Sequence, residues 1–163
     1  MQSVANKISV VIPLYNKRES IALSIASVVA QSVAPREIIV VDDGSTDGSG
    51  DVVEALAAEN PTIRLIHQTN RGVSAARNRA IEVATGEYVA LLDGDDTWSE
   101  GYIAQICRLI TIYPDCGAYA TGFYVVDGRE CAVGDTPKSE GVVDFFAESQ
   151  RHYVLIPSAT TLN

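Results

Sequence analysis

Short β-branched runs alternate with longer stretches of helical periodicity along this chain, and the alternation restricts the fold more than any other feature. The runs lie at Ile8 to Leu14, Glu37 to Val41, Ile63 to Ile66 and Tyr88 to Leu92. Strands that alternate with helices are joined as βαβ units, which place the strands parallel to one another in one sheet. The sequence therefore predicts an α/β fold with a mostly parallel sheet.

Four amphipathic helices are predicted between and after these runs. In the first helix, Ile21, Ile25, Val28 and Val29 follow the spacing of one helical face. A second helix is suggested by Asp47, Asp51, Val52, Val53 and Leu56, with the acidic residues in its first turn. A third runs from a cap at about Ser74 to a stop at Gly86, and the fourth carries Ile103, Ile106, Leu109 and Ile110 between a cap at Ser99 and Pro114. This pattern supports the βαβ arrangement.

The pattern changes beyond Pro114. Tyr119 to Val126, followed by Asp127-Gly128 and Arg129 to Val133, predicts a hairpin closed by a type I′ turn, which makes the sheet mixed. A short buried element is indicated by the apolar residues Val142, Val143, Phe145 and Phe146, and residues 156–163 look like the start of another element. We treat residues 1–163 as one domain and expect the natural chain to continue past Asn163.

Size and charge exclude several classes of protein. A chain of 163 residues makes one domain that buries ~70% of its unfolded surface. Its net charge is −9, with no cluster of basic and aromatic residues, so nucleic acid is not an expected partner. No apolar stretch approaches the ~20 residues of a membrane span, and the N-terminus does not resemble a signal peptide. We expect a soluble, cytoplasmic protein.

The cysteines and histidines carry no disulfide or metal signature. Cys107, Cys116 and Cys131 are odd in number and contain no C-x-x-C pair, which predicts reduced, structural thiols. His67 and His152 have no partner at ligand spacing. Structural roles are expected for both histidines.

Acidic clusters directly follow two of the predicted strands. Residues 93–96 (DGDD) come after the run at 88–92, and residues 42–45 (DDGS) come after the run at 38–41. Ligands of open α/β sheets bind outside the carboxyl ends of the strands, so both clusters would meet at one edge. Acidic loops are often merely solvated. A divalent cation, Mn²⁺ or Mg²⁺, held by Asp93 and Asp95 would instead allow a diphosphate to approach this negative edge.

Two common phosphate-binding signatures are missing. The sequence has no G-x-x-x-x-G-K-[ST] motif, which excludes P-loop nucleotide hydrolysis. Gly48-Ser49-Gly50 lacks the third glycine of a dinucleotide-binding loop. Gly44 is better explained by a tight turn after the acidic pair.

Four segments in order resemble the family 2 glycosyltransferases over roughly residues 7–125. They are residues 10–16 (VVIPLYN), 40–47 (VVDDGSTD), 70–78 (NRGVSAARN) and 86–98 (GEYVALLDGDDTW). The resemblance implies the GT-A fold, a Rossmann-like three-layer α/β/α sandwich that binds a nucleotide-sugar. It also implies Mn²⁺ or Mg²⁺ as cofactor.

The resemblance further implies roles for seven residues. Pro13 and Tyr15 would line the base pocket, Asp43 would accept the imide N–H of uracil, Arg77 and Asn78 would face the ribose and phosphates, and Asp93 and Asp95 would form the D-x-D pair, one near the ribose and the other on the metal. Two of these residues have an ordinary structural alternative: a half-buried strand-end position for Tyr15 and a solvated helix charge for Arg77.

For four neighbouring residues the role stays open. Asp42 is compatible with a cap of the following turn, and Trp98 either walls the sugar pocket or packs in the core. Arg71 and Asp96 lie within the same motifs without a fixed role.

The implied function is inverting transfer of a sugar from a nucleoside diphosphate, with UDP favoured, to a saccharide or lipid-linked acceptor. Cell-surface polysaccharide synthesis and peripheral attachment to the inner face of the membrane are what the family suggests. Inverting transfer needs a carboxylate base. Glu140, Asp144 and Glu148 are carboxylates in the C-terminal stretch but lie in no recognisable motif, so no base is assigned.

Two alternatives from other classes stay open. The first is a non-catalytic module that binds sugar nucleotides, which the missing base suggests. The second is a phosphoreceiver-type signalling domain, because Val40-Val41-Asp42-Asp43 is similar to a Mg²⁺-binding acidic pair at the end of a strand. In receivers that pair follows the first strand, whereas here the first strand ends in Pro13-Leu14-Tyr15.

Overall fold

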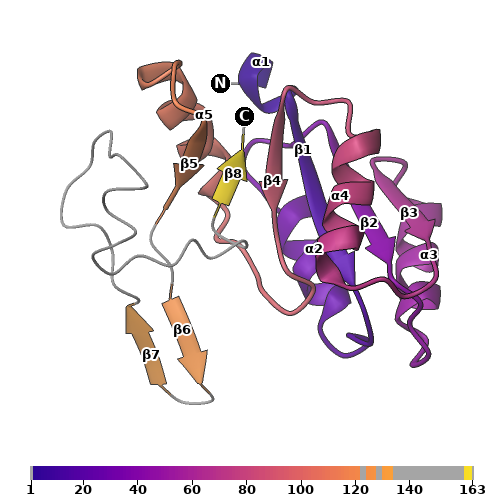
Figure 1. Ribbon diagram of the computed structural model, residues 1–163. Coiled ribbons are helices and arrows are strands. Elements are labelled where there is room, and N and C mark those ends of the chain that lie inside the picture. Colours follow the sequence, from indigo (N-terminus) through magenta and orange to yellow (C-terminus); the bar gives the residue numbers. More distant parts are fainter. Residues whose placement is uncertain (1, 122–123, 128–129, 134–159, 163) are drawn as a thin grey trace.

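The computed structural model describes residues 2–121, 124–127, 130–133 and 160–162, with side chains described for residues 3–121. Its central sheet has the strand order β3-β2-β1-β4-β8-β5 (Figure 1). The strands are β1 (Ile8–Leu14), β2 (Glu37–Asp42), β3 (Ile63–His67), β4 (Tyr88–Leu91), β5 (Ala118–Ala120) and β8 (Thr160–Leu162). Strands β1 to β4 are parallel, as predicted, whereas β8 runs antiparallel to both β4 and β5.

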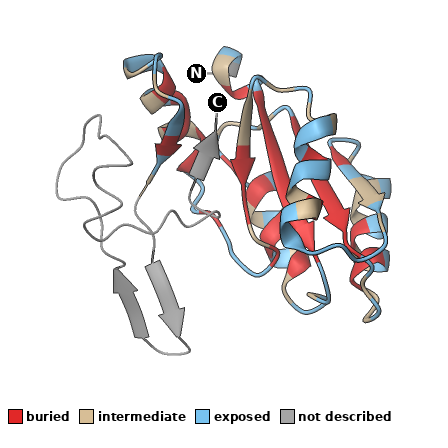
Figure 2. Cartoon of the chain, viewed as in Figure 1, coloured by how far each residue is buried: buried red, intermediate tan, exposed pale blue. Residues whose placement is uncertain are grey.

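Helices cover both faces of this sheet (Figures 1 and 2). They are α1 (Gln2–Ala5), α2 (Ile21–Val29), α3 (Ser49–Glu59), α4 (Val73–Val83) and α5 (Tyr102–Ile112). One apolar cluster joins the sheet to α2, α3 and α5, and a second joins its other face to α4. The predicted three-layer α/β/α arrangement is therefore confirmed.

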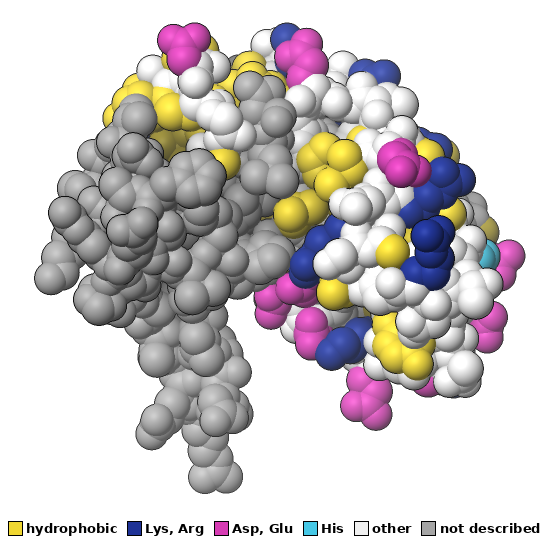
Figure 3. Space-filling view, in the orientation of Figure 1, with side chains coloured by type: hydrophobic (Ala, Val, Ile, Leu, Met, Phe, Trp, Pro, Cys, Tyr) yellow, Lys and Arg dark blue, Asp and Glu magenta, His cyan; other side chains and the backbone are white. Residues whose placement is uncertain are grey.

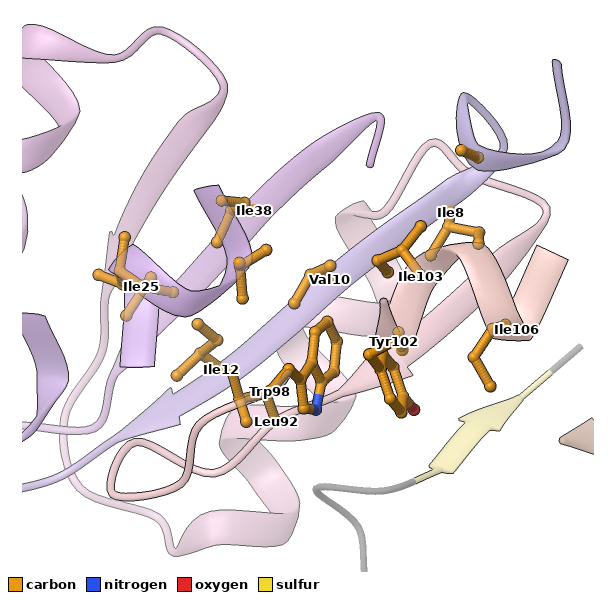
Figure 4. Close-up of a cluster of buried hydrophobic side chains, with 14 of the residues drawn as sticks. Ile8, Val10, Ile12, Ile25, Ile38, Leu92, Trp98, Tyr102, Ile103 and Ile106 are labelled. Carbon is orange, nitrogen blue, oxygen red and sulfur yellow. The ribbon is translucent and has the colours of Figure 1, made fainter. Parts of the chain in front are cut away.

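Side-chain alternation along β1 explains the two clusters. Val10 and Ile12 belong to the cluster that faces α2 and α5, whereas Val11 belongs to the cluster that faces α4. Figure 4 shows Val10 and Ile12 beside Trp98 and Tyr102 on the first face. Every residue of β1 is buried, as expected for a strand covered on both sides. Full burial of one such aliphatic side chain stabilises the fold by about 1.5–3 kcal/mol.

The four predicted strands are confirmed with bounds that shift by at most one residue. Strands β2 and β3 each end one residue later than predicted, at Asp42 and His67, and β4 ends one residue earlier, at Leu91. On α2, however, Val29 is 49% exposed, so its predicted place on the buried face is wrong. Ser24 is buried there instead, within the same helix.

The predicted helix ends are partly wrong because backbone geometry decides them. Helix α4 begins after Gly72, whose φ is +89°, and α5 begins after Gly101, so neither Ser74 nor Ser99 is the N-cap. Helix α3 begins at Ser49, which leaves Asp47 before the helix while Asp51 lies in its first turn.

Gly86 is not a helix stop, because α4 already ends at Val83. A Cβ at Gly86 would lie 2.4 Å from the carbonyl oxygen of Lys7 and 2.8 Å from the amide nitrogen of Ser9. Contacts this short with backbone atoms cannot be relieved by a rotamer change. Gly86 is therefore required for the close approach of the chain to β1.

The predicted hairpin forms as a separate two-stranded sheet, but its first strand was predicted too long, because Tyr119 and Ala120 belong to β5 of the main sheet. It consists of β6 (Tyr124–Asp127) and β7 (Glu130–Val133), and Asp127 pairs with Glu130 as a strand residue rather than lying in the turn. The mixed character of the main sheet comes instead from β8, within the stretch predicted to begin another element. Residues 128–129 and the predicted element at 142–146 lie outside the described residues.

Strand order excludes the receiver alternative. Receiver domains have the flavodoxin-like order 2-1-3-4-5, whereas β1 here lies between β2 and β4, with β3 next to β2. That interpretation of the Asp42-Asp43 pair is wrong. None of the helices in the described part of the chain has the length and apolar character to cross a membrane.

Candidate functional site

A pocket of about 540 Å³ opens at the edge where β1, β2 and β4 end. It is lined by residues from the end of β1, from the segments that follow β1, β2, β3 and β4, and from the start of α4: Pro13, Leu14, Tyr15, Lys17, Asp43, Asn70, Gly72, Val73, Ala76, Arg77, Asp93, Gly94 and Asp95. Acidic and basic side chains both gather along this lower edge of the molecule (Figure 3). Parallel strand ends thus bring distant segments of the sequence into one site.

Six of the seven residues predicted for nucleotide-sugar or metal binding line this pocket. They are Pro13, Tyr15, Asp43, Arg77, Asp93 and Asp95. The seventh, Asn78, is exposed on α4 and is not part of the lining. The topology therefore brings Asp43 together with Asp93 and Asp95, although about fifty residues separate them in the sequence.

Asp43 is nearly enclosed by the loop that follows β3. Its side chain is buried, and its Oδ1 accepts hydrogen bonds from Gln68 Nε2 at 2.7 Å and from the Arg71 amide at 2.8 Å. Its Oδ2 accepts one from the Gly72 amide at 2.8 Å. Burial alone would raise the pKa of Asp43, but these hydrogen bonds outweigh it and lower the pKa. Asp43 is therefore a charged acceptor at the pocket wall.

Asp42 caps the turn, as the sequence suggested. Its Oδ1 accepts a hydrogen bond from the Ser45 amide at 2.9 Å, and its Oδ2 lies 3.2 Å from His67 Nδ1. Gly44 in this turn has φ +76°, which explains the glycine. His67 contacts Asp42 and is not among the residues that line the pocket, so its structural role stays a prediction. His152 lies outside the described residues.

Arg77 and Asp93 form an ion pair at the pocket. Arg77 Nη2 lies 2.5 Å from Asp93 Oδ1, with side chains 20% and 30% exposed. Arg77 Nε is buried and is the one such side-chain atom without a hydrogen-bond partner in the described part of the chain. A buried donor without an acceptor is costly. A ligand that supplies an oxygen there would remove this cost.

Lys17 and Asp95 form a second ion pair, with Nζ 2.5 Å from Oδ2. Both side chains are close to half exposed, and the hydrogen bond to Asp95 raises the pKa of Lys17. Lys17 was not singled out from the sequence. Its signal was its position directly after the Tyr15-Asn16 end of the first motif, next to a predicted phosphate site.

Asp93 and Asp95 fit a divalent cation that is completed by a ligand. No group of three or more potential metal-ligating residues forms within the described residues, so the protein offers two carboxylates rather than a closed cage. One oxygen of each carboxylate contacts Arg77 or Lys17, which leaves Asp93 Oδ2 and Asp95 Oδ1. Mg²⁺ and Mn²⁺ are commonly bound by one or two carboxylates together with phosphate oxygens and water.

Trp98 has a packing role rather than a pocket role. Its ring is buried and stacks on Tyr102, with ring centroids 4.1 Å apart (Figure 4). Trp98 is not part of the pocket lining, and exposed Asp96 is not either. Arg71 contributes its backbone amide to Asp43. At the pocket itself, Tyr15 and Val73 are about half exposed and offer apolar surface.

Comparisons with known proteins agree with this site. The family model "Glycosyl transferase family 2" matches residues 9–153. The chain is 48% identical over 96 residues to an uncharacterised glycosyltransferase, YibD, of Escherichia coli; the match covers 59% of this chain and 28% of YibD.

Solved structures extend the likeness to three dimensions. S. aureus TarS residues 1–349 in complex with UDP superpose with a TM-score of 0.69 at 28% identity, over 76% of this chain and 37% of that one. The mannosyltransferase PcManGT of Pyrobaculum calidifontis, in complex with GDP-Man and Mn²⁺, gives a TM-score of 0.65 at 31% identity, over 71% and 35%. The chain spans about a third of the length of these relatives.

The fold and the comparisons together define a GT-A type α/β protein, as the sequence predicted. The matched family model covers most of the chain. The chain belongs to glycosyltransferase family 2.

Proposed function

We propose that this chain binds a UDP-linked sugar together with Mn²⁺ or Mg²⁺ and serves an inverting sugar transfer. The proposal rests on one observation: Asp43, Asp93 and Asp95 line the same pocket. A nucleoside diphosphate requires a hydrogen-bond acceptor for its base and a cation for its phosphates. Asp43 would supply the acceptor, and Asp93 and Asp95 would hold the cation.

At one end of the pocket, the base would lie against Tyr15 and Pro13. Tyr15 is half exposed, so its ring face is available for stacking on a flat heterocycle. Asp43 is a charged acceptor there, and a carboxylate accepts the imide N–H of uracil. The complex of TarS with UDP supports the choice of a uridine donor.

At the other end, the diphosphate would lie near Asp93, Asp95 and the start of α4. A divalent cation on the two carboxylates would supply positive charge toward the diphosphate leaving group. The unpartnered Arg77 Nε and the N-terminal end of α4 add donors and positive potential on the same side. The Mn²⁺ and GDP-Man in PcManGT support a divalent cation at such a site.

Family membership alone supports the proposals for the acceptor substrate and for the pathway. We propose a saccharide or lipid-linked acceptor and a role in cell-surface polysaccharide synthesis, with the protein cytoplasmic or peripheral at the inner face of the membrane. Inverting transfer needs a carboxylate that takes the acceptor proton. No carboxylate of the described residues is assigned that role.

Calorimetry of UDP binding tests the proposal. With Mn²⁺ present we expect saturable binding, and we expect EDTA or Asp95→Asn to weaken it by at least about tenfold, because a charge-assisted contact is lost. Glu87→Gln is the matched control, since Glu87 is an exposed carboxylate outside the pocket that pairs with Lys7. Tight UDP binding that ignores both EDTA and Asp95→Asn would refute the role given to the carboxylates.

A sugar-transfer assay with UDP-sugars separates the enzyme from the non-catalytic alternative. Metal-dependent UDP binding without any donor hydrolysis or transfer, in the full-length protein, would favour a binding module.

A further inference from the structure

Gln68 is a half-buried residue that is linked to the pocket through the carboxylate of Asp43. Its Nε2 donates to Asp43 Oδ1 at 2.7 Å, and its backbone amide donates to the carbonyl oxygen of Asp42 at 2.9 Å. Gln68 itself does not line the pocket. Any effect of Gln68 on a ligand would therefore be exerted through the carboxylate of Asp43.

The carboxylate of Asp43 has few hydrogen-bond acceptor positions left for a ligand. An ionised carboxylate has about four acceptor positions, two on each oxygen. Oδ1 of Asp43 already accepts from Gln68 Nε2 and from the Arg71 amide, and Oδ2 accepts from the Gly72 amide. One position on Oδ2 remains. The 2% exposure of Asp43 agrees with so narrow an opening.

Nucleobases differ in how many N–H donors they present to a carboxylate, and therefore in how many acceptor positions they need. Uracil and thymine have a single ring N–H between two carbonyl groups, so one acceptor position satisfies them. Guanine presents its ring N–H next to an amino group, and this pair of donors fits two free carboxylate positions. With one position free, a guanine donor would remain unpaired in the pocket, which is unfavourable.

We infer that Gln68 is a positioning residue that sets base selectivity: by filling Oδ1 of Asp43 it leaves one acceptor position, which suits a uracil-type base and disfavours guanine. The inference rests on the proposed function, because it assumes that the pocket binds a nucleoside diphosphate. It adds a residue outside the pocket that decides which diphosphate is preferred.

Competitive calorimetry of UDP and GDP with Mn²⁺ tests this inference. We expect the wild-type chain to prefer UDP by about tenfold or more, the ratio that one unpaired donor produces. Gln68→Met keeps the length of the side chain but frees Oδ1, so the UDP preference should fall at least about threefold. Gln68→Lys restores a donor and should keep the preference. Thr69→Ala is the matched control, because Thr69 is an exposed neighbour in the same loop.

The outcomes separate the inference from the proposed function. A reduced preference in Gln68→Met, with Gln68→Lys and Thr69→Ala unchanged, supports the inference. Equal weakening of UDP and GDP in Gln68→Met would show a merely structural residue and overturn it. Equal affinity of the wild-type chain for UDP and GDP would overturn it without any variant. Failure of the wild-type chain to bind either diphosphate would overturn the proposed function and, with it, this inference.

Discussion

The ammonium group of Lys17 lies 2.5 Å from Oδ2 of Asp95, one of the two carboxylates proposed to hold the cation. The side chains are 43% and 49% exposed. A pair this exposed contributes about 1 kcal/mol or less. Lys17 therefore neutralises Asp95 weakly enough for a divalent cation to compete with it.

Lys17→Met should strengthen the binding of Mn²⁺ in the absence of nucleotide by about two- to fivefold, because the competing positive charge is removed. Titration of free Mn²⁺ by electron paramagnetic resonance measures this affinity directly. The control is Lys7→Met, which breaks the exposed Lys7–Glu87 pair outside the pocket and should leave Mn²⁺ affinity unchanged. Unchanged or weaker Mn²⁺ binding in Lys17→Met would show that Lys17 does not compete for Asp95.

Arg77→Lys should weaken UDP binding in the presence of Mn²⁺ by about tenfold. Lysine keeps the charge but loses the planar fork with which Arg77 holds Asp93, and it loses the buried Nε donor. Arg79→Lys is the matched control on α4, because Arg79 is half exposed and pairs with Glu82. Calorimetry on both variants decides the point. Because both substitutions keep the positive charge, an unchanged UDP affinity in Arg77→Lys would mean that helix charge alone matters.

Glu37 is a buried carboxylate at the start of β2, away from the pocket. It accepts hydrogen bonds from Ser9 Oγ at 2.8 Å, from the Thr85 amide at 2.8 Å and hydroxyl at 2.7 Å, and from Arg64 Nη1 at 2.7 Å. Burial would raise the pKa of Glu37, but these hydrogen bonds outweigh it and lower the pKa from 4.5 to about 2. The network ties β1, β2, β3 and the segment before β4 together.

Glu37→Gln should lower the free energy of unfolding near neutral pH by about 3 kcal/mol, the order of stabilisation that corresponds to a pKa lowered from 4.5 to about 2. Because the folded pKa is depressed, this stabilisation is complete above 4.5 and is lost as the pH falls toward about 2. Urea unfolding of wild type and variant across this range measures the difference. A difference that stays constant from neutral pH to about pH 2 would contradict the assigned network.

Trp98→Leu should destabilise the fold by roughly 2–4 kcal/mol and leave UDP affinity nearly unchanged. The large ring fills the core beside Tyr102 and is not part of the pocket lining. Thermal unfolding together with UDP calorimetry separates the two effects. Retained stability with lost UDP binding would mean that Trp98 contributes to the sugar pocket rather than to the core.

The strands were predictable because buried parallel strands are short, apolar and β-branched, and all four predicted runs have that pattern. Helix ends were less predictable. Gly72 begins α4 through a backbone angle of φ +89°, and Gly86 is needed only because Lys7 and Ser9 of a distant segment lie against it. Neither condition can be read from local sequence.

The pocket was predictable in outline because parallel strand ends share one edge, which placed Asp43 with Asp93 and Asp95. The contacts that other side chains make with these carboxylates were not predictable. Lys17 and Asp95 are 78 residues apart and Gln68 and Asp43 are 25 apart, and both contacts depend on side-chain conformation across loops. Sequence spacing fixes which segments meet, but not which atoms.

Anomalous diffraction from crystals grown with UDP and Mn²⁺ tests the central claim most directly, because it locates the cation independently of any activity. We predict a Mn²⁺ peak that joins a carboxylate of Asp93 or Asp95 to the diphosphate, with the uracil ring against Tyr15 and its N–H on Asp43. A Mn²⁺ site away from both aspartates, or a uracil ring outside this pocket, would contradict the account.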